Sequence, residues 1–184
     1  MNVQKYGRDI KVNRELLTAS NVHVVSGFNC ELDDLNFLEY LADEAIYDNE
    51  ARTYVYIDQN GKASAFASLS CTVLMQVDNK ENKSSTKYYP AILIDKFIVD
   101  SSLRHLRYSP EEERTFSEIV FMDVLEYIEE LAMNYIGAKY VVLYSTPKAK
   151  HFYEKCEDVN DFTEYMAGVN DPYLEDCHPM YAII

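Results

Sequence analysis

A long amphipathic helix between two apolar strands constrains the fold of this chain more than any other feature. Residues 90–100 (PAILIDKFIVD) are apolar on both faces, as expected of a central strand that is covered on both sides. Residues 116–135 repeat apolar side chains at helical spacing, and residues 139–145 (KYVVLYS) form a second buried strand candidate. A strand, a long helix and a strand in this order predict a parallel pair joined by a right-handed crossover.

Two local signals mark the ends of this helix. Thr115 and Glu118 have the spacing of a capping box, in which each side chain accepts a hydrogen bond from the other residue's backbone amide. Gly137 is placed where a glycine commonly ends a helix in a left-handed conformation. The helix is therefore expected to begin near Thr115 and to stop before Gly137.

The N-terminal half of the chain predicts shorter elements. We expect an arm or a short helix over residues 1–20, a strand over 21–28 and an amphipathic helix with an acidic outer face over 31–45. Residues 53–57 and 62–77 predict a β-hairpin, because the Asn60-Gly61 pair between them supplies the positive φ angles of a tight turn.

The remaining segments complete the predicted order of elements. The polar stretch 78–87 predicts a loop, Pro147 predicts the start of a short helix, and residues 162–166 and 180–184 are the last strand candidates. Hairpins on both sides of the parallel pair predict a mixed sheet. Residues 1–184 are therefore expected to form a single α/β (α+β) domain.

Charge and composition narrow the partners and the location. The chain has 17 Lys and Arg against 31 Asp and Glu, a net charge of −14, which argues against DNA, tRNA and anionic membranes because phosphate binding depends on basic side chains. There is no membrane-spanning apolar run and no signal-peptide core, and among the cysteines and histidines only Cys177 and His178 are adjacent, which is not enough for a zinc site. We therefore expect a cytoplasmic protein without a structural metal.

Several stretches resemble the GNAT (Gcn5-related) N-acetyltransferases in the same order along the chain. Residues 65–74 (AFASLSCTVL) and 92–100 (ILIDKFIVD) are similar to two strands of that family, and KYVVLYS followed by KAKHFYEKC is similar to its last conserved strand and helix. Residues 27–30 (GFNC) and 51–55 (ARTYV) resemble the members akin to tRNA-acetylating toxins. The resemblance implies a mostly antiparallel sheet with a splayed central parallel pair and helices on both faces.

The resemblance also implies a binding site for acetyl-CoA as co-substrate. Backbone groups of Phe97, Ile98 and Val99 would bind the pantetheine arm, with Ser145 at the end of the partner strand. The family's pyrophosphate loop is rich in glycine, whereas residues 104–117 contain none. Either Arg104 and Arg107 replace the missing backbone contacts with side-chain charge, or this segment is a surface turn whose basic residues offset nearby glutamates.

Two residues are candidates for acid–base catalysis. Tyr153, within the FYEK stretch, matches the family tyrosine that protonates the leaving thiolate, although a core tyrosine is the alternative in a chain with 16 Tyr. Asp95 lies where some family members carry a strand carboxylate, and it is the candidate base for the amine proton. The adjacent Lys96 leaves open that Asp95 belongs to a solvated ion pair.

The acceptor is less defined than the reaction. Carboxylates crowd residues 31–50 and 154–176, which predicts either solvated faces or attraction of a cationic acceptor, such as an amine-bearing small molecule or a basic protein. Two alternatives to an enzyme stay open: a non-catalytic GNAT-shaped protein that acts through protein–protein contact, and an acidic decoy that imitates nucleic acid. The tyrosines and the apolar C-terminus could also support a homodimer.

Overall fold

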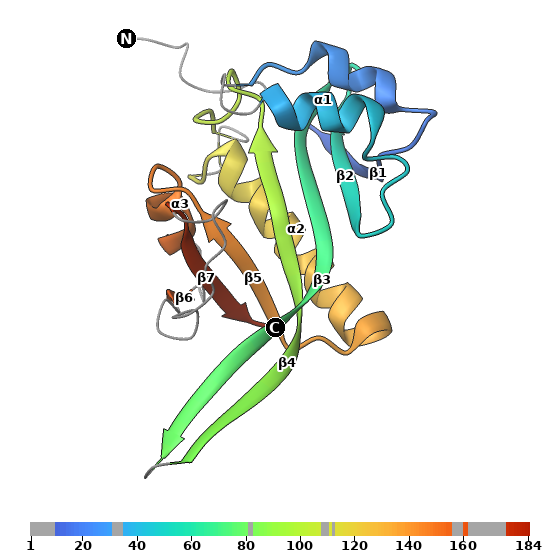
Figure 1. Ribbon diagram of the computed structural model, residues 1–184. Helices are drawn as coiled ribbons and strands as arrows, with labels where there is room; N and C mark the ends of the chain where they lie inside the picture. The colour runs from blue at the N-terminus through green and yellow to red at the C-terminus, as the bar shows by residue number, and fades with distance from the viewer. Residues whose placement is uncertain are drawn as a thin grey trace. The chain divides into compact units, whose positions relative to one another are not determined.

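The computed structural model describes residues 10–30, 35–80, 83–107, 111, 113–155, 160–161 and 176–184 (Figure 1). The chain divides into two compact units, Met1–Leu69 with Lys96–Val124 and Ser70–Asp95 with Leu125–Ile184. We call these the first and the second unit. Strands β3 (Ala63–Lys80) and β4 (Lys83–Val99) run through both, so that the expectation of a single domain stays a prediction.

The strands of the first unit follow the order β1-β2-β3-β4. Strand β1 (Val12–Leu16) is antiparallel to β2 (Ala51–Asp58), with Val12 opposite Asp58 and Leu16 opposite Tyr54. The predicted arm or helix over residues 1–20 is therefore wrong for this segment, and residues 1–9 lie outside the described part. The backbone groups of β1 form their hydrogen bonds with β2, which is distant in the sequence, so the residues of β1 alone do not predict a strand.

The predicted hairpin between β2 and β3 is confirmed. Gly61 takes a φ of 77°, and its amide donates to the carbonyl of Asp58 at 3.0 Å. The Asp58 carboxylate accepts the amides of Asn60 at 2.8 Å and Lys62 at 2.9 Å. Burial opposes the shift, but these backbone hydrogen bonds hold the pKa of Asp58 below its usual value.

The strand predicted over residues 21–28 is instead a 3₁₀ helix, η2 (Val22–Gly27). The adjacent side chains of Val24 and Val25 are both buried, which a strand with one covered face does not allow because neighbours point to opposite sides. The Asn21 side chain sets up this turn by accepting the Thr18 amide at 2.8 Å. Helix α1 (Leu35–Asp43) follows and confirms the predicted amphipathic helix over its described part.

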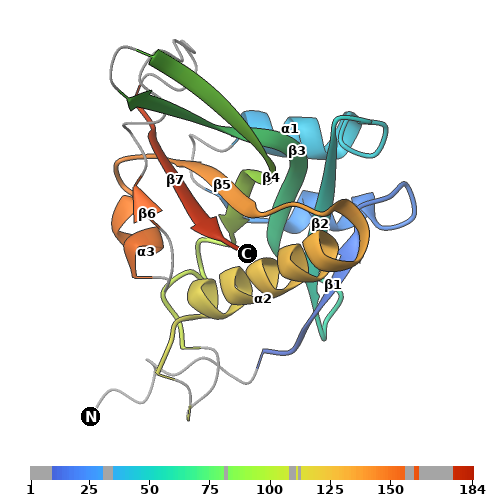
Figure 2. The same cartoon turned by 90° about the horizontal axis from the view of Figure 1, so that it is seen from below.

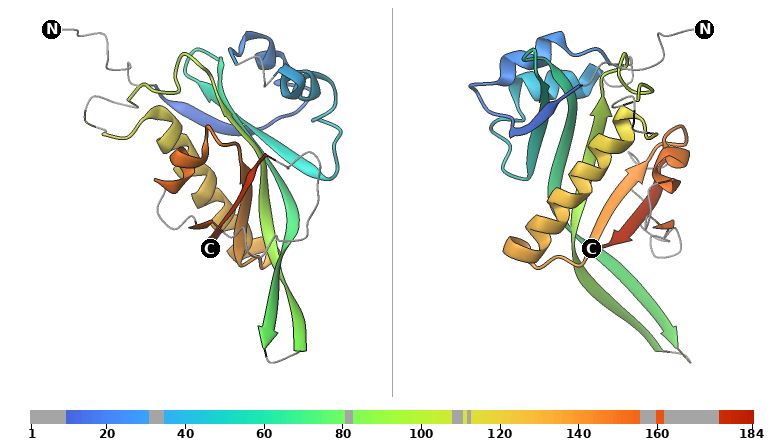
Figure 3. Two further views of the ribbon diagram at one scale, coloured as in Figure 1. Left: turned by 60° about the vertical axis from the view of Figure 1, so that its left-hand side comes forward. Right: turned by 180° about the vertical axis from the view of Figure 1, so that it is seen from behind.

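Alternate residues of β2 and β4 face different helices of the first unit. Val55 and Ile98 belong to the buried cluster that packs against α1 and η2. Their neighbours face α2 (Phe116–Leu131): Tyr56 donates a hydrogen bond to Asp123, and the Phe97 ring lies 5.1 Å from the ring of Phe121. Within this unit, helices therefore cover both faces of the sheet, as the left panel of Figure 3 shows.

The long helix follows the prediction closely. Its buried stripe is formed by Phe116, Val120, Phe121, Val124 and Ile128. The last turn widens into a π-helical segment (Ala132–Ile136), which Gly137 ends with a φ of 69° and an amide donated to the carbonyl of Ala132 at 2.8 Å. Figure 2 shows the whole length of α2 in the foreground. Among the described residues, none of the helices is long and apolar enough to cross a membrane.

The second unit contains the predicted parallel pair. Its strand order is β3-β4-β5-β7-β6, with β5 (Tyr140–Ser145), β6 (Asn160–Asp161) and β7 (His178–Ile183). Ala91–Ile94 of β4 pair in parallel with Tyr140–Leu143, whereas β5 and β7 are antiparallel. Strand β7 confirms the last predicted strand, and the candidate at 162–166 lies outside the described residues.

The predicted loop over residues 78–87 is wrong. Strand β3 continues to Lys80 and β4 begins at Lys83, so that most of this segment belongs to a two-stranded ribbon. The side chains of Ser85, Thr86 and Lys87 are exposed. A strand that is solvated on both faces needs no apolar alternation, and its polar sequence therefore looks like a loop.

Candidate functional site

The last residues of β4 extend past the parallel ladder. The pairing of β4 with β5 ends at Ile94 and Leu143, while β4 runs on to Val99 and β5 to Ser145. Ile98 and Val99 are buried, and the Phe97 ring packs on Phe121. The backbone of these three residues therefore lies beyond the β4–β5 ladder, and their binding of pantetheine stays a prediction.

The turn after β4 is folded back on the end of that strand. The backbone amides of Leu103 and Arg104 both donate to the carbonyl of Asp100, at 2.9 and 3.1 Å. The half-buried side chain of Arg104 donates from Nη2 to the carbonyl of Val99 at 3.4 Å. These bonds place one guanidinium group at the carboxyl end of β4.

The same turn is attached to the start of α2. Ser117 Oγ donates to the carbonyl of Arg104 at 2.8 Å, and the amide of Phe116 donates to the carbonyl of Leu106 at 2.6 Å. Arg107 forms an isolated antiparallel bridge with Thr115. Two predicted basic residues, Arg104 and Arg107, are thereby brought to the beginning of one helix, whereas residues 108–110 and 112 lie outside the described part.

The capping box at this helix start is confirmed. Glu118 Oε2 accepts the Thr115 amide at 2.6 Å and the Thr115 hydroxyl at 2.7 Å, and Thr115 Oγ1 accepts the Glu118 amide at 3.3 Å. The amides of Thr115, Phe116 and Glu118 are therefore donated within the protein. The resemblance implied a phosphate site built from backbone amides at this position, and three of these amides are taken by protein groups. Arg104, Arg107 and Arg114 carry the positive charge of this turn and helix start.

Asp100 is a polar residue of this region that was not among the predicted site residues. It is only 8% exposed, and its carboxylate accepts three hydrogen bonds, from the amide of Asn29, the amide of Ser102 and the hydroxyl of Ser102. The signal was present in the sequence: an Asp followed by serines directly after an apolar strand favours a turn in which the carboxylate accepts a nearby amide.

The second unit holds the other three predicted site residues. Asp95 is exposed on β4, as is the neighbouring Lys96 of the first unit, so both the base and the solvated pair remain open. Ser145 is buried at the end of β5, where its hydroxyl donates to the carbonyl of Thr146 at 2.9 Å. That carbonyl also accepts the amides of Ala149 and Lys150, both at 3.0 Å, so Ser145 contributes to the turn that leads into helix α3 (Lys150–Glu154).

Tyr153 lies on the short helix α3 (Lys150–Glu154), which begins three residues after Pro147 rather than at it. Its side chain is 9% exposed, and its ring meets the ring of Phe152 edge to face at 5.1 Å. Lys150 and Glu154 form an ion pair of 3.8 Å across one turn of this helix. The tyrosine is therefore buried and in contact with an aromatic neighbour, which suits both a positioned acid and a core aromatic.

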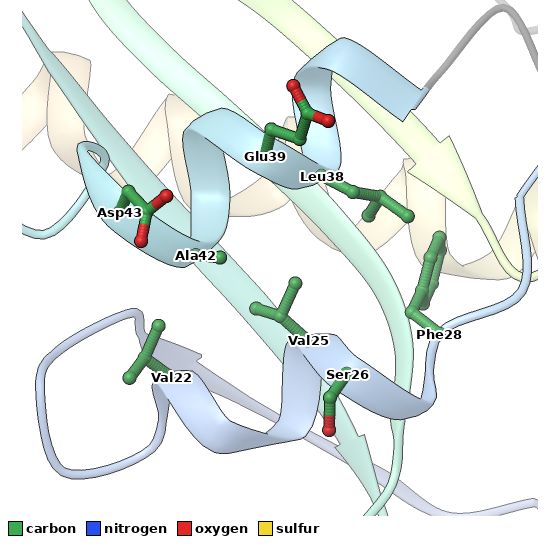
Figure 4. Close-up of a pocket in the computed structure, with 8 residues that line it drawn as sticks. All are labelled: Val22, Val25, Ser26, Phe28, Leu38, Glu39, Ala42 and Asp43. Carbon is green, nitrogen blue, oxygen red and sulfur yellow. The ribbon is translucent and has the colours of Figure 1, made fainter.

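A cleft in the first unit was also not predicted. It lies between η2 and α1, has a volume of about 470 Å³, and is mostly apolar, being lined by Val22, Val25, Ser26, Phe28, Leu38, Glu39, Ala42 and Asp43. Valines of η2 face α1 across the cleft, and the carboxylate of Glu39 points away from η2 (Figure 4). The sequence could not place this cleft, because residues 21–28 were predicted to be a strand.

Comparison with known proteins identifies the fold. No protein-family model and no curated protein matches the chain. Among solved structures, a mutant form of the AtaT toxin matches with a TM-score of 0.67 and 13% identity, over 100% of this chain and 94% of the other. AtaTR bound with AcCoA matches with a TM-score of 0.67 and 13% identity, over 94% of this chain and 93% of the other. A GNAT-family acetyltransferase from Staphylococcus aureus Mu50 matches with a TM-score of 0.54 and 13% identity, over 94% of this chain and 99% of the other.

The chain has the GNAT fold. The resemblance inferred from the order of motifs and the predicted fold class, with its mostly antiparallel sheet and one central parallel pair, are confirmed at this level. At 12–15% identity, the similarity to the solved structures extends to the fold and not to a particular acceptor.

The expectation that DNA and tRNA are not partners is corrected by the same comparison. The GNAT fold occurs in a structure of AtaT complexed with acetyl-methionyl-tRNAfMet, at a TM-score of 0.60, and in a KacTA–DNA complex, at 0.65. A net charge of −14 does not justify the exclusion, because nucleic acid binding depends on where the basic side chains lie and on the partners present in the complex.

Proposed function

We propose that this protein transfers the acetyl group of acetyl-CoA to a primary amine. The GNAT fold supports this function, since the similar structures include AtaTR bound with AcCoA and a GNAT-family acetyltransferase. The observation that carries the proposal is the turn after β4. Its hydrogen bonds place the Arg104 guanidinium 3.4 Å from the carbonyl of Val99, at the end of the strand that would hold the cofactor.

In this proposal, backbone groups bind the pantetheine arm of the cofactor and charged side chains bind its phosphates. The backbone of Phe97, Ile98 and Val99, beyond the β4–β5 ladder, would hydrogen-bond the amides of the pantetheine arm. Arg104 and Arg107 would bind the phosphates through charge-assisted hydrogen bonds, which are stronger than neutral ones. Ser145, whose hydroxyl is donated to Thr146, retains acceptor capacity for an amide of the cofactor.

The chemistry is direct aminolysis of a thioester. The amine nitrogen attacks the acetyl carbonyl carbon, a C–N bond forms and the C–S bond breaks. The leaving CoA thiolate takes a proton from the hydroxyl of Tyr153, and the attacking amine releases a proton to Asp95, directly or through water. Asp95 is exposed, so that a water-mediated route is open to it.

The first acceptor to test is the α-amino group of an aminoacyl-tRNA. AtaT, a protein of the same fold, has been solved with acetyl-methionyl-tRNAfMet, in which that amino group carries the acetyl group. The α-amine of an aminoacyl ester is a primary amine and meets the chemical requirement of direct attack.

Transfer of radiolabelled acetyl from acetyl-CoA to methionyl-tRNA, to other aminoacyl-tRNAs and to free amines tests the proposal. We expect Tyr153→Phe to lower kcat by about 100-fold, because a general acid typically contributes at least that factor. Tyr135→Phe is the matched control, since the Tyr135 side chain is 75% exposed in the same unit.

Full activity of Tyr153→Phe would remove the acid role and leave the transfer reaction standing. Absence of transfer to every amine, together with absence of acetyl-CoA binding, would contradict the enzyme and favour the non-catalytic GNAT-shaped protein.

A further inference from the structure

A buried carboxylate at the end of β4 connects three segments of the first unit. Asp100 Oδ2 accepts the amide of Asn29 at 3.0 Å, and Oδ1 accepts the amide of Ser102 at 2.9 Å and its hydroxyl at 2.6 Å. The backbone amide of Asp100 donates to the carbonyl of Ser64 on β3 at 3.0 Å. A carboxylate that is only 8% exposed is thus compensated by three donors.

The contact with Asn29 is reciprocal. While Asn29 donates its amide to the Asp100 carboxylate, the amide of Ser101 donates to the carbonyl of Asn29 at 2.8 Å. Two hydrogen bonds therefore fix the segment after η2 against the first residues of the turn. Phe28, directly before Asn29, packs in the core with its ring 5.0 Å from the ring of Phe66, and this packing holds the Asn29 backbone in place.

The turn that Asp100 holds is the one that carries Arg104. The carbonyl of Asp100 accepts the amides of Leu103 and Arg104, and Ser117 Oγ fixes the carbonyl of Arg104 from the other side. The turn contains no glycine whose backbone could approach a phosphate closely, so binding there depends on where the guanidinium is placed. Hydrogen bonds that hold the backbone of the turn fix the position of the guanidinium before the cofactor binds. A group fixed in this way loses less conformational freedom on binding, and the affinity is higher.

We propose that Asp100 is a positioning residue for acetyl-CoA binding: by clamping Asn29 and Ser102, it holds the turn in which Arg104 meets the phosphates of the cofactor. This role rests on the proposed function. Asp100 contacts protein groups and acts on the cofactor through Arg104.

Asp100→Asn is the sharpest variant, because it keeps the size of the side chain and removes one acceptor. The carboxylate accepts from Ser102 on one oxygen and from Asn29 on the other. An asparagine has a single acceptor oxygen, and its amide group would face a second donor on the other side. One half of the clamp must therefore open, whichever way the amide is turned.

Asp58→Asn is the matched control in the same unit. The Asp58 carboxylate also accepts two backbone amides within a turn, from Asn60 at 2.8 Å and from Lys62 at 2.9 Å, but that turn joins β2 to β3. Both substitutions remove one charge from a carboxylate-held turn, but Oδ1 of Asp58 accepts both of these amides, so Asp58→Asn can keep them and controls for the loss of charge. The difference is that Asp100 is connected directly to Arg104, because its carbonyl accepts the Arg104 amide.

The experiment combines calorimetric titration of acetyl-CoA with amide hydrogen exchange and the thermal midpoint of each variant. We expect Asp100→Asn to raise the Kd for acetyl-CoA by at least about tenfold, the loss of roughly one charge-assisted interaction. KM for acetyl-CoA should rise in parallel while kcat changes less, and the amides of Asn29, Ser102 and Arg104 should exchange faster. Asp58→Asn should leave Kd unchanged.

If Asp100→Asn is not folded at the assay temperature, Ser102→Ala replaces it, since that change removes only the 2.6 Å bond from the hydroxyl. We expect it to raise Kd in the same direction by about two- to threefold. Wild-type protein that binds acetyl-CoA, with Kd unchanged in both variants, would overturn the positioning role and leave the proposed function intact. Wild-type protein that binds no acetyl-CoA would overturn both.

Discussion

The hydroxyl of Tyr56 donates a 2.7 Å hydrogen bond to Oδ2 of Asp123, and this bond joins strand β2 to helix α2. Tyr56 is only 1% exposed. The Arg14 guanidinium donates to the same carboxylate and, at 3.1 Å, to the carbonyl of Asp123, which brings β1 into the cluster. Three elements distant in sequence therefore meet at one carboxylate of the first unit.

Removal of the Tyr56 hydroxyl should weaken this junction. We expect Tyr56→Phe to lower the free energy of unfolding by about 1–2 kcal/mol, because the substitution keeps the ring and takes away a part-buried hydrogen bond to a charged group. Urea unfolding measures the change. Tyr47→Phe is the control, since Tyr47 is 75% exposed, and equal stabilities of the two variants would contradict the role of the bond.

The same residue predicts how stability changes at high pH. Burial, and next the hydrogen bond to Asp123, raise the pKa of Tyr56 well above its ordinary value. The folded state therefore holds the proton more tightly than the unfolded chain, whose tyrosines titrate near pH 10. The resulting stabilisation is complete below about pH 10 and is lost as the pH rises further, because the unfolded state then releases the proton first.

Thermal unfolding between pH 8 and pH 11 checks this prediction. The midpoint of the wild-type protein should fall more steeply above about pH 10 than that of Tyr56→Phe, which lacks the group. Parallel curves for the two proteins would show that Tyr56 does not carry the effect.

The end of the long helix provides a backbone prediction. Gly137 has a φ of 69°, and a Cβ built there would meet no atom within 4 Å, so only the backbone conformation resists a side chain. We expect Gly137→Ala to destabilise the protein by about 1–2 kcal/mol, the cost of placing an L-residue in the left-handed region. Gly27→Ala, where a Cβ also has open space but φ is not positive, should cost far less. Chemical denaturation of the two variants compares them, and equal losses would contradict the argument.

Local signals in the sequence predicted the central part of the fold well. The apolar strands, the helical spacing, the Thr115–Glu118 capping box and the stop at Gly137 all act within a few residues, and each is present in the structure. The hairpin turn at Gly61 is a signal of the same kind. The GNAT fold was suggested by stretches that resemble the family's motifs in the same order along the chain.

The parts that failed depend on contacts between distant residues. Residues 22–27 have the alternation of a strand, but the core requires Val24 and Val25 to be buried together, and a 3₁₀ helix results. The polar ribbon of β3 and β4 was predicted to be a loop, because a strand without a buried face has no alternation of apolar residues. The interstrand hydrogen bonds that form the ribbon leave no pattern in such a sequence.

The candidate site shows the same division. Arg104 and Arg107 are recognisable by charge, and the structure brings both to the start of α2. Only the Ser102 half of the Asp100 clamp has a local signal. The Asn29 half has none, because Asn29 lies far away in the sequence and donates a backbone amide that any residue other than proline could provide. The exclusion of nucleic acid failed for a related reason: net charge averages over the chain, whereas recognition is local.

Calorimetric titration of acetyl-CoA into the wild-type protein and into Arg104→Ala/Arg107→Ala tests the central proposal most directly. We predict that the wild-type protein binds acetyl-CoA with a micromolar Kd and that the double variant binds it at least about tenfold more weakly. Salt should also weaken binding to the wild type, because charged side chains rather than helix amides bind the phosphates. Lys11→Ala/Lys62→Ala, which removes two exposed positive charges of the same unit, should bind like the wild type. Equal binding by all three proteins, or no heat at millimolar acetyl-CoA, would contradict the proposed site.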